Sequence, residues 1–416
     1  MRLLGMIAGA ALALSATVGA SALHAADTVK IAFIEGLSGP FARTGAQGQA
    51  HFEFAADTFV NEPGDLLDGT KFEIVPFDNK TSPKESLIQL QVAIDQGIRY
   101  VLQGNSSGVA NALTEAIEKH NRRNPDSKVL FLNYSAVDPA LTNENCQFHH
   151  FRFDANADIK MDALTDVIAK DQSIKKVYLI GQDYSFGKAV AKAAREMLAE
   201  KRPDIEIVGD ELHPIGKVKD FTPYARKIVA SEADAMITGN WGSDMLGLAK
   251  SVIGAGYDKP IYTYYAASDG ITKTLGAQGK GIVRLVAEGQ QNPPPSDEAS
   301  AYYEAFKKRY PDYDLSQPRI ANVIRMLKAA MAKAGSTDVD AVATAMEGME
   351  MDNFWGGKIM MREADHQLIQ DVFILEHTDE GVTFPYDNSD YGIVVESKVP
   401  MASADAPTTC KMRRPS

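Results

Sequence analysis

The sequence has little positive charge, few cysteines and only one long hydrophobic run. Its 416 residues carry 43 lysines and arginines against 55 acidic side chains, which gives a formal net charge of −12. Such a chain has no broad basic surface for a phosphate backbone, so nucleic acid is not an expected partner. Hydrophobic residues make up 45% and charged residues 24% of the chain, which is typical of a globular protein with a sizeable core and excludes a disordered or fibrous chain.

The one long hydrophobic run, residues 3–23, stands at the N-terminus directly after Arg2. It is rich in alanine, glycine and serine, and no basic stop-transfer segment follows it. These features favour a secretory signal peptide over an uncleaved membrane anchor. We assign residues 1–25 to the signal peptide, with cleavage after Ala25 or, as the alternative, after Ala22. The mature protein is therefore expected in an exported aqueous compartment.

The chain has two cysteines, Cys146 and Cys410. In an oxidising compartment an even pair is more often bridged than free, so the sequence predicts a disulfide between them. The bridge would tie the C-terminal tail, residues 401–416, to the segment before His149 and His150; the other possibility is two unrelated buried thiols. The two histidines would point to opposite faces of a strand, and no further ligand lies at a suitable spacing, so we expect neither a metal site nor a cofactor.

Strand-length apolar runs alternate with helical segments along the chain. This alternation predicts parallel α/β sheets, and the number of units exceeds what one open sheet usually holds, so two doubly wound lobes are expected. The predicted strands are residues 29–34, 72–77, 100–102, 129–132, 177–180, 205–208, 235–238, 261–264, 282–287 and 369–376. The predicted helices are residues 44–61, 83–97, 109–121, 157–169, 188–200, 222–231, 244–254, 297–309, 318–334 and 339–348.

The sequence contains none of the common nucleotide-binding or zinc-protease signatures. The phosphate loop G-x-x-x-x-G-K-[ST], the dinucleotide fingerprint G-x-G-x-x-G and the zinc motif H-E-x-x-H are all absent. Asp183, His213 and Asp269 could be imagined as acid, base and orienting group, but they have no recognisable spacing. We therefore expect a binding protein rather than an enzyme.

In an open α/β sheet, ligands bind in the loops after the carboxyl ends of the strands. Two such loops in the first half, residues 104–108 and 133–136, offer backbone amides and hydroxyl groups to an anion at the start of a helix. The corresponding loops of the second half carry aromatic side chains, which would form a wall for an apolar ligand body. The alternatives are ordinary helix capping and ordinary aromatic packing. Trp241 is the strongest single candidate, because a large apolar side chain in a loop needs a reason for its position.

Several segments carry a family resemblance: residues 31–42, 103–107, 133–142 and 151–153, with further matches at 184–187, 219–223 and 362–367. In these segments the chain resembles the leucine/isoleucine/valine-binding family of periplasmic solute-binding proteins. The resemblance implies the type I periplasmic binding protein fold, with two lobes joined by three hinge crossings near residues 151–154, 264–268 and 355–361. The implied division is residues 26–152 and 290–354 for lobe 1, 153–289 and 355–400 for lobe 2 or the hinge return, and 401–416 for the tail.

The family resemblance also implies how the ligand is held. A serine hydroxyl and backbone amides of the first lobe bind the α-carboxylate, which implies Ser107, Ser135 and Ala136, with Ser106 beside them. Where relatives often have an aromatic residue this chain has Thr44 next to Arg43, and the acid that pairs the α-ammonium group is absent or displaced to Asp269. The full candidate set for ligand binding is Ser106, Ser107, Ser135, Ala136, Tyr184, Phe186, Asn240, Trp241, Tyr265 and Asp269.

The function that the resemblance implies is transport. It implies a monomeric periplasmic receptor without catalytic activity, which captures a small hydrophobic carboxylate and delivers it to an ABC permease in the inner membrane. The ligand class expected first is a branched-chain or related amino acid. If the ammonium partner is truly missing, an aromatic acid such as a benzoate or a phenylpropanoid is the alternative ligand. A periplasmic ligand sensor of the same fold is the alternative role.

Overall fold

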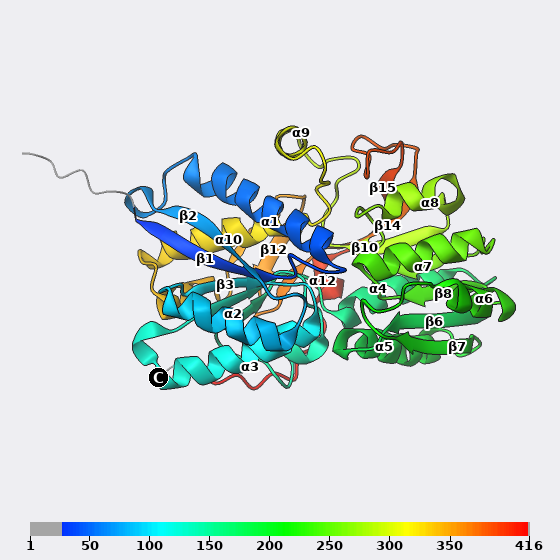
Figure 1. Cartoon of the computed structure of the whole chain (residues 1–416), viewed down its shortest axis with the longest axis horizontal. Coiled ribbons are helices and arrows are strands. Elements are labelled where there is room, and N and C mark those ends of the chain that lie inside the picture. Colours follow the sequence, from blue (N-terminus) through cyan, green and yellow to red (C-terminus); the bar gives the residue numbers. More distant parts are fainter. Residues whose placement is uncertain (1–26, 415–416) are drawn as a thin grey trace, which may run out of the picture.

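The computed structural model describes residues 27–414, and the signal peptide predicted at residues 1–25 lies outside the described residues. The chain forms two α/β lobes that lie side by side (Figure 1), which confirms the predicted fold class. No helix within residues 27–414 is both long and apolar enough to cross a membrane.

Lobe 1 contains a five-stranded parallel sheet in the order β2-β1-β3-β4-β5. Every residue of β3 and β4 is buried, because helices cover both faces of the sheet. Local signals start the helices: α2 has Pro83 at its first position and Ser82 as its N-cap, whose hydroxyl accepts the Glu85 amide. The elements are β1 (Thr28–Glu35), α1 (Ala42–Ala56), β2 (Lys71–Asp78), α2 (Pro83–Asp95), β3 (Tyr100–Gln103), α3 (Ser107–Arg123), β4 (Leu130–Asn133) and β5 (His150–Arg152).

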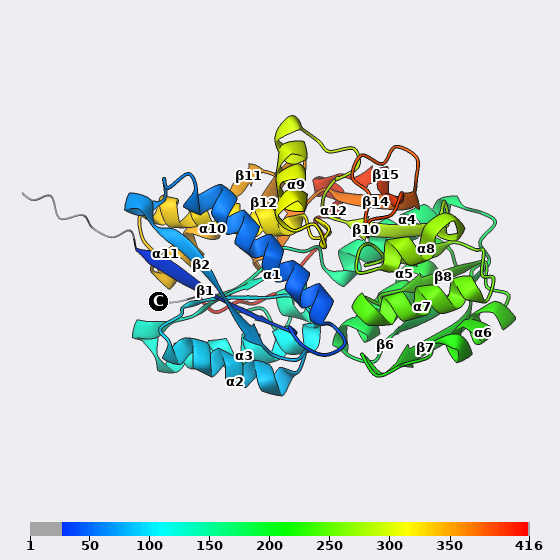
Figure 2. The same ribbon diagram turned by 45° about the horizontal axis from the view of Figure 1, so that its top comes forward.

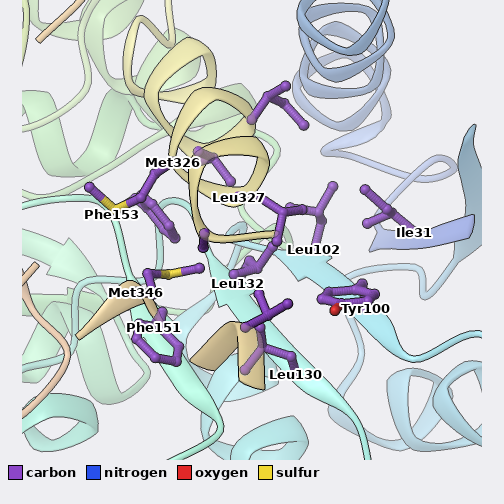
Figure 3. Close-up of a cluster of buried hydrophobic side chains, with 14 of the residues drawn as sticks. Ile31, Tyr100, Leu102, Leu130, Leu132, Phe151, Phe153, Met326, Leu327 and Met346 are labelled. Carbon is purple, nitrogen blue, oxygen red and sulfur yellow. The ribbon is translucent and has the colours of Figure 1, made fainter. Parts of the chain in front are cut away.

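Later segments of the chain complete the core of lobe 1. Figure 3 shows Met326, Leu327 and Met346 against Leu102 and Leu132 of the sheet. The methionines and Leu327 belong to two helices, and a small antiparallel sheet of three strands adds further side chains to the same core. These elements are α10 (Arg319–Ala334), α11 (Val339–Met346), β11 (Glu350–Asp352), β12 (Lys358–Met361) and β13 (Leu368–Gln370).

Lobe 2 is built around a seven-stranded sheet in the order β15-β14-β10-β9-β8-β6-β7. The strands from β10 to β7 are parallel, and β14 and β15 extend the sheet in antiparallel fashion. The elements are α4 (Ala157–Lys170), β6 (Lys176–Gln182), α5 (Ser185–Lys201), β7 (Glu206–His213), α6 (Thr222–Ala230), β8 (Ala235–Thr238), α7 (Gly242–Gly254), β9 (Ile261–Thr263), α8 (Ile271–Gly279), β10 (Val283–Ala287), β14 (Val372–Thr378) and β15 (Gly392–Val399).

One helix, α9 (Asp297–Arg309), stands over the junction of the lobes (Figure 2). Its Tyr302 ring lies edge-on to Phe54 of α1, with the ring centroids 4.8 Å apart. Its Tyr303 ring stacks at 3.9 Å on Phe384, which lies between β14 and β15 of lobe 2. The helix therefore packs against both lobes.

Sheet membership locates the chain crossings. The chain passes between lobes at residues 153–156, at residues 288–296 and at Asp371. The second position differs from the prediction, because residues 264–268 join β9 to α8 within lobe 2. The third also differs, because residues 358–361 form β12, which pairs with β11 and β13 and contributes side chains to the lobe 1 core. Residues 355–370, which the sequence assigned to lobe 2 or the hinge return, therefore pack with lobe 1.

The C-terminal tail returns across the hinge from lobe 2 to lobe 1. After β15 and the short α12 (Met401–Ala404), the amide of Thr409 donates to the side-chain oxygen of Asn143 in lobe 1 at 2.9 Å. Cys410 then forms a disulfide with Cys146, 264 residues away in the sequence. The predicted disulfide is confirmed, and it fastens the tail to the other lobe.

Removing this disulfide should lower the free energy of unfolding, because the bridge restricts the unfolded chain over 264 residues. For Cys146→Ser, Cys410→Ser or the reduced wild-type protein, we expect a loss of about 3–5 kcal/mol in urea unfolding. Reductant should change nothing further in the Cys146→Ser/Cys410→Ser double variant, which is the control. A reduced wild-type protein as stable as the oxidised one would contradict the prediction.

Candidate functional site

A cavity that is partly open to solvent lies between the lobes, and its empty space, counted together with the open solvent at its mouth, is about 860 Å³. The loops that follow β3, β4, β6, β8 and β9 line it, as expected from the carboxyl ends of parallel strands. Nine of the ten predicted ligand-binding residues are on its surface: Ser106, Ser107, Ser135, Ala136, Tyr184, Phe186, Trp241, Tyr265 and Asp269. Their role in binding a ligand stays a prediction.

The lobe 1 wall of the cavity is suited to an anion. α3 begins at Ser107, and no side chain caps its N-terminus, so the positive end of this helix faces the cavity without an acidic or hydroxyl acceptor. The Ser107 hydroxyl accepts the amide of Asp138 at 3.2 Å, and the Ser135 hydroxyl accepts Nη2 of Arg319 at 2.6 Å. A carboxylate here would meet a helix terminus, hydroxyl groups and a guanidinium group, all of which stabilise negative charge.

Some of the hydrogen-bond donors near this anion-binding wall are already used by the protein's own carboxylate, Glu35. Its Oε1 accepts the amides of Gly104 at 2.6 Å and Asn105 at 2.9 Å, and the hydroxyl of Tyr134 at 2.7 Å. Burial raises the pKa of Glu35 to about 7, although these hydrogen bonds act to lower it. A ligand carboxylate is therefore left with the serine hydroxyls and the start of α3. The sequence analysis missed Glu35, because its partners lie in the loops directly after two other strands, β3 and β4, and become neighbours only in the folded sheet.

The lobe 2 wall is aromatic. Trp241 lines the cavity, and its Nε1 donates to the hydroxyl of Tyr184 at 2.8 Å. Its ring also stacks on Phe41 of lobe 1, with the ring centroids 4.1 Å apart. Trp241 thus both forms the wall and holds the lobes together. Phe41, three positions before Thr44, does not line the cavity itself but supports it through this stack, and spacing alone could not show that its side chain reaches across to the other lobe.

Asp269 is the acid on the lobe 2 side of the cavity. Its Oδ2 accepts the hydroxyl of Thr44 in lobe 1 at 2.6 Å. Its Oδ1 has no hydrogen-bond partner, and the nearest cation is Arg43, whose Nε lies 3.7 Å away. Burial raises the pKa of Asp269 to about 6, with the Thr44 hydrogen bond and Arg43 acting against it. The displaced acid expected from the sequence is therefore present at the cavity, with one unpaired oxygen.

The hinge end of the cavity holds a group of four buried charges, Asp154, Lys160, Glu288 and Arg319, here called the hinge ion cluster. Lys160 Nζ lies 2.8 Å from Asp154 Oδ1 and 2.5 Å from Glu288 Oε1. Arg319 completes the cluster, with Nη1 at 3.3 Å from Glu288 Oε2 and Nε at 3.4 Å from Asp154 Oδ2. The ring of Tyr265 covers Lys160 Nζ at 4.7 Å.

The two acids of this cluster differ in proton affinity. Burial, followed by repulsion from Asp154, raises the pKa of Glu288, although Lys160 and Arg319 act to lower it. Burial also acts to raise the pKa of Asp154, but Arg319 and Lys160 outweigh it and lower the pKa. The sequence analysis named none of these residues, because they are far apart in the chain and no motif links them.

Asn240 is the predicted binding residue that does not line the cavity. Its side-chain amide pairs with the imidazole of His213, with Nδ2 and Nε2 at 2.8 Å, so it joins the ends of β8 and β7 inside lobe 2. Asp183 forms an ion pair at the surface. The catalytic set imagined from Asp183, His213 and Asp269 is therefore not assembled. Within residues 27–414, no group of three or more histidine, cysteine or acidic side chains is placed to hold a metal ion.

Comparison with known proteins agrees with this geometry. A family model described as periplasmic binding protein matches residues 28–381. Leu/Ile/Val-binding protein homolog 4 of Brucella melitensis is 32% identical over 424 residues, covering 98% of this chain and 97% of the relative. A solved structure of a leucine-, isoleucine-, valine-, threonine- and alanine-binding protein from Brucella ovis, in a closed conformation, is 29% identical with a TM-score of 0.82 and covers 94% of this chain and all of its own.

A solute-binding protein of an ABC transporter from Rhodopseudomonas palustris, solved in complex with benzoate, has a TM-score of 0.77 and covers 92% of this chain and 99% of its own. At 18% identity this likeness concerns the fold alone. The family resemblance stated from the sequence is confirmed by the family model and the curated relatives.

Replacing Lys160 with methionine should destabilise the protein strongly, because Asp154 and Glu288 would then share a buried site with only one cation. We expect a loss of about 3–5 kcal/mol in urea unfolding, and partial recovery when Glu288→Gln is added. The matched control is Lys188→Met, which removes an exposed ion pair with Asp183 and should cost less than about 1 kcal/mol. Equal losses for the two lysines would contradict the role of the hinge ion cluster.

Proposed function

The chain belongs to the periplasmic binding protein family, and on this premise we propose that it captures a branched-chain or related hydrophobic amino acid for an ABC importer of the inner membrane. The cavity needs only to bind, since a ligand that contacts both lobes favours their closure and no chemistry on the ligand is required. A periplasmic location, a monomeric state and an ABC permease as partner are parts of this proposal. The Brucella relatives named for leucine, isoleucine and valine support the ligand class.

The observation that carries the amino-acid proposal is the unpaired oxygen of Asp269. A buried carboxylate without a full set of hydrogen bonds is costly, and the ammonium group of an amino acid would supply the missing donor and add a positive charge to that of Arg43. The α-carboxylate would then lie across the cavity at Ser107 and Ser135, beside the start of α3. The aliphatic side chain would contact the aromatic wall of lobe 2.

An aromatic acid is the second candidate ligand. The observation that favours it is the wall formed by Tyr184, Phe186 and Trp241, which would stack on a ring. Such a ligand carries no ammonium group and would leave Asp269 Oδ1 unpaired inside the closed cavity. Asp269 therefore distinguishes the two candidates.

Asp269→Asn should separate them experimentally. The amide oxygen can still accept the Thr44 hydroxyl, so the lobes should close as before, but the charge that would pair an ammonium group is lost. We expect the affinity for L-leucine to fall by about tenfold or more, while 4-methylpentanoate or benzoate changes less than about twofold. Calorimetric titration of ligand-free protein measures both. Equal effects on ligands with and without the amino group, or tight binding of benzoate alone by the wild type, would count against the amino-acid proposal.

The affinity for L-leucine should also depend on pH. Asp269, with its pKa raised to about 6, is mostly protonated at pH 5 and mostly charged at pH 7.5, and only the charged form pairs an ammonium group. We therefore expect about tenfold weaker binding at pH 5 than at pH 7.5. Glu35, with its pKa raised to about 7, also titrates in this range, so the difference between the wild type and Asp269→Asn isolates the contribution of Asp269. The same pH slope in both proteins would exclude it.

A further inference from the structure

We propose that Gln317 is a second acceptor for the ammonium group of the ligand, placed on lobe 1 opposite Asp269. This inference rests on the proposed function, because it needs a ligand that carries an ammonium group. It adds a specificity residue that neither the sequence motifs nor the family resemblance indicated.

Gln317 lines the cavity and is 7% exposed, yet its Oε1 has no hydrogen-bond partner. A buried amide oxygen in this state costs free energy unless a bound molecule pairs it. The position is held by its neighbours: the Pro318 carbonyl accepts the indole Nε1 of Trp355 at 2.6 Å, and the Gln317 carbonyl accepts the Ile320 amide at 3.1 Å. The amide group is therefore presented at the cavity from a fixed backbone.

The backbone segments that carry Gln317 and Asp269 are joined by one side chain. Nε2 of Gln47 donates to the hydroxyl of Ser316 at 2.5 Å and to the hydroxyl of Ser268 at 3.2 Å. Ser316 precedes Gln317, and Ser268 precedes Asp269. The two unpaired acceptors, Gln317 Oε1 and Asp269 Oδ1, thus come from neighbouring segments that line the same cavity.

The other acid of the cavity is not available for this role. Both carboxylate oxygens of Glu288 already face cations, Lys160 at 2.5 Å and Arg319 at 3.3 Å. Asp269 and Gln317 together instead offer one charged and one neutral acceptor. An ammonium group has three N–H donors and no acceptor, so it can bond to both.

This arrangement couples recognition to closure. Asp269 belongs to lobe 2, and Gln317 belongs to the segment that leads into α10 of lobe 1. An ammonium group that bonds to both residues can do so only when the lobes are together, so it adds differential affinity for the closed state. A carboxylate that lacks the amino group would leave both acceptors unpaired.

The test compares L-leucine with 4-methylpentanoate, which is leucine without its amino group, by calorimetry on ligand-free protein. Gln317→Met keeps the volume and removes the acceptor. We expect leucine to bind at least about tenfold more weakly and 4-methylpentanoate to change less than about twofold. The melting temperature of the ligand-free variant should be equal to or above that of the wild type, because an unpaired buried oxygen has been removed.

Gln317→Glu is the matched variant, since it keeps the shape and the acceptor oxygens, and it should retain the preference for leucine. If Gln317→Met unfolds, this variant still decides the matter, because loss of the leucine preference would overturn the inference. Equal weakening of both ligands in Gln317→Met, or no weakening of leucine, would overturn it as well.

Ligand binding by the wild-type protein distinguishes a failure of the Gln317 inference from a failure of the proposed function. Wild-type protein that prefers leucine, with Gln317→Met unchanged, contradicts only the role of Gln317. Wild-type protein that binds 4-methylpentanoate as tightly as leucine contradicts the ammonium site altogether, and the amino-acid proposal with it.

Discussion

The hinge ion cluster is the constraint around which the two lobes are arranged. Moving four charged groups out of water is costly, and the cost is offset only while all partners remain together. Asp154 lies in the first crossing and Glu288 in the second, whereas Lys160 comes from α4 of lobe 2 and Arg319 from α10 of lobe 1. The cluster therefore ties both lobes and two crossings to one point. Because Lys160, Glu288 and Arg319 also line the cavity, the cluster fixes the hinge end of the binding site.

The remaining contacts between the lobes around the cavity are of a different kind. They include the Phe41–Trp241 stack, the Thr44–Asp269 and Gln47–Ser268 hydrogen bonds and the ion pair between Arg43 and Asp269. Each is of the order of 1 kcal/mol and can be broken without leaving an isolated buried charge pair. A ligand that touches both walls can therefore shift the balance between open and closed lobes. The ion cluster at the hinge and the weak contacts beyond it together suit a protein that closes on its ligand.

The alternation of strands and helices allowed most of the fold to be predicted, but the crossings depend on contacts that the alternation does not contain. Residues 369–376 have the composition of a single strand, yet the structure divides this stretch at Asp371 and sends β13 to one lobe and β14 to the other. β15 was missed because its outer half is polar and partly exposed at the edge of the sheet. In both cases the partner strand, rather than the local sequence, decides the outcome.

For the binding site too, part could be predicted from the sequence and part could not. The sequence by itself determined two α/β lobes, the disulfide partners and nine residues of the cavity wall, because parallel strands place the loops at their carboxyl ends on one edge whatever the details of packing. Only the tertiary structure decided that Glu35 accepts the amides of the loop after β3, that Phe41 stacks on Trp241, and that Asp269 and Gln317 each keep an oxygen without a hydrogen bond. The physical reason is that hydrogen bonding and burial of these side chains depend on residues distant in the chain, so their state exists only once the lobes have come together.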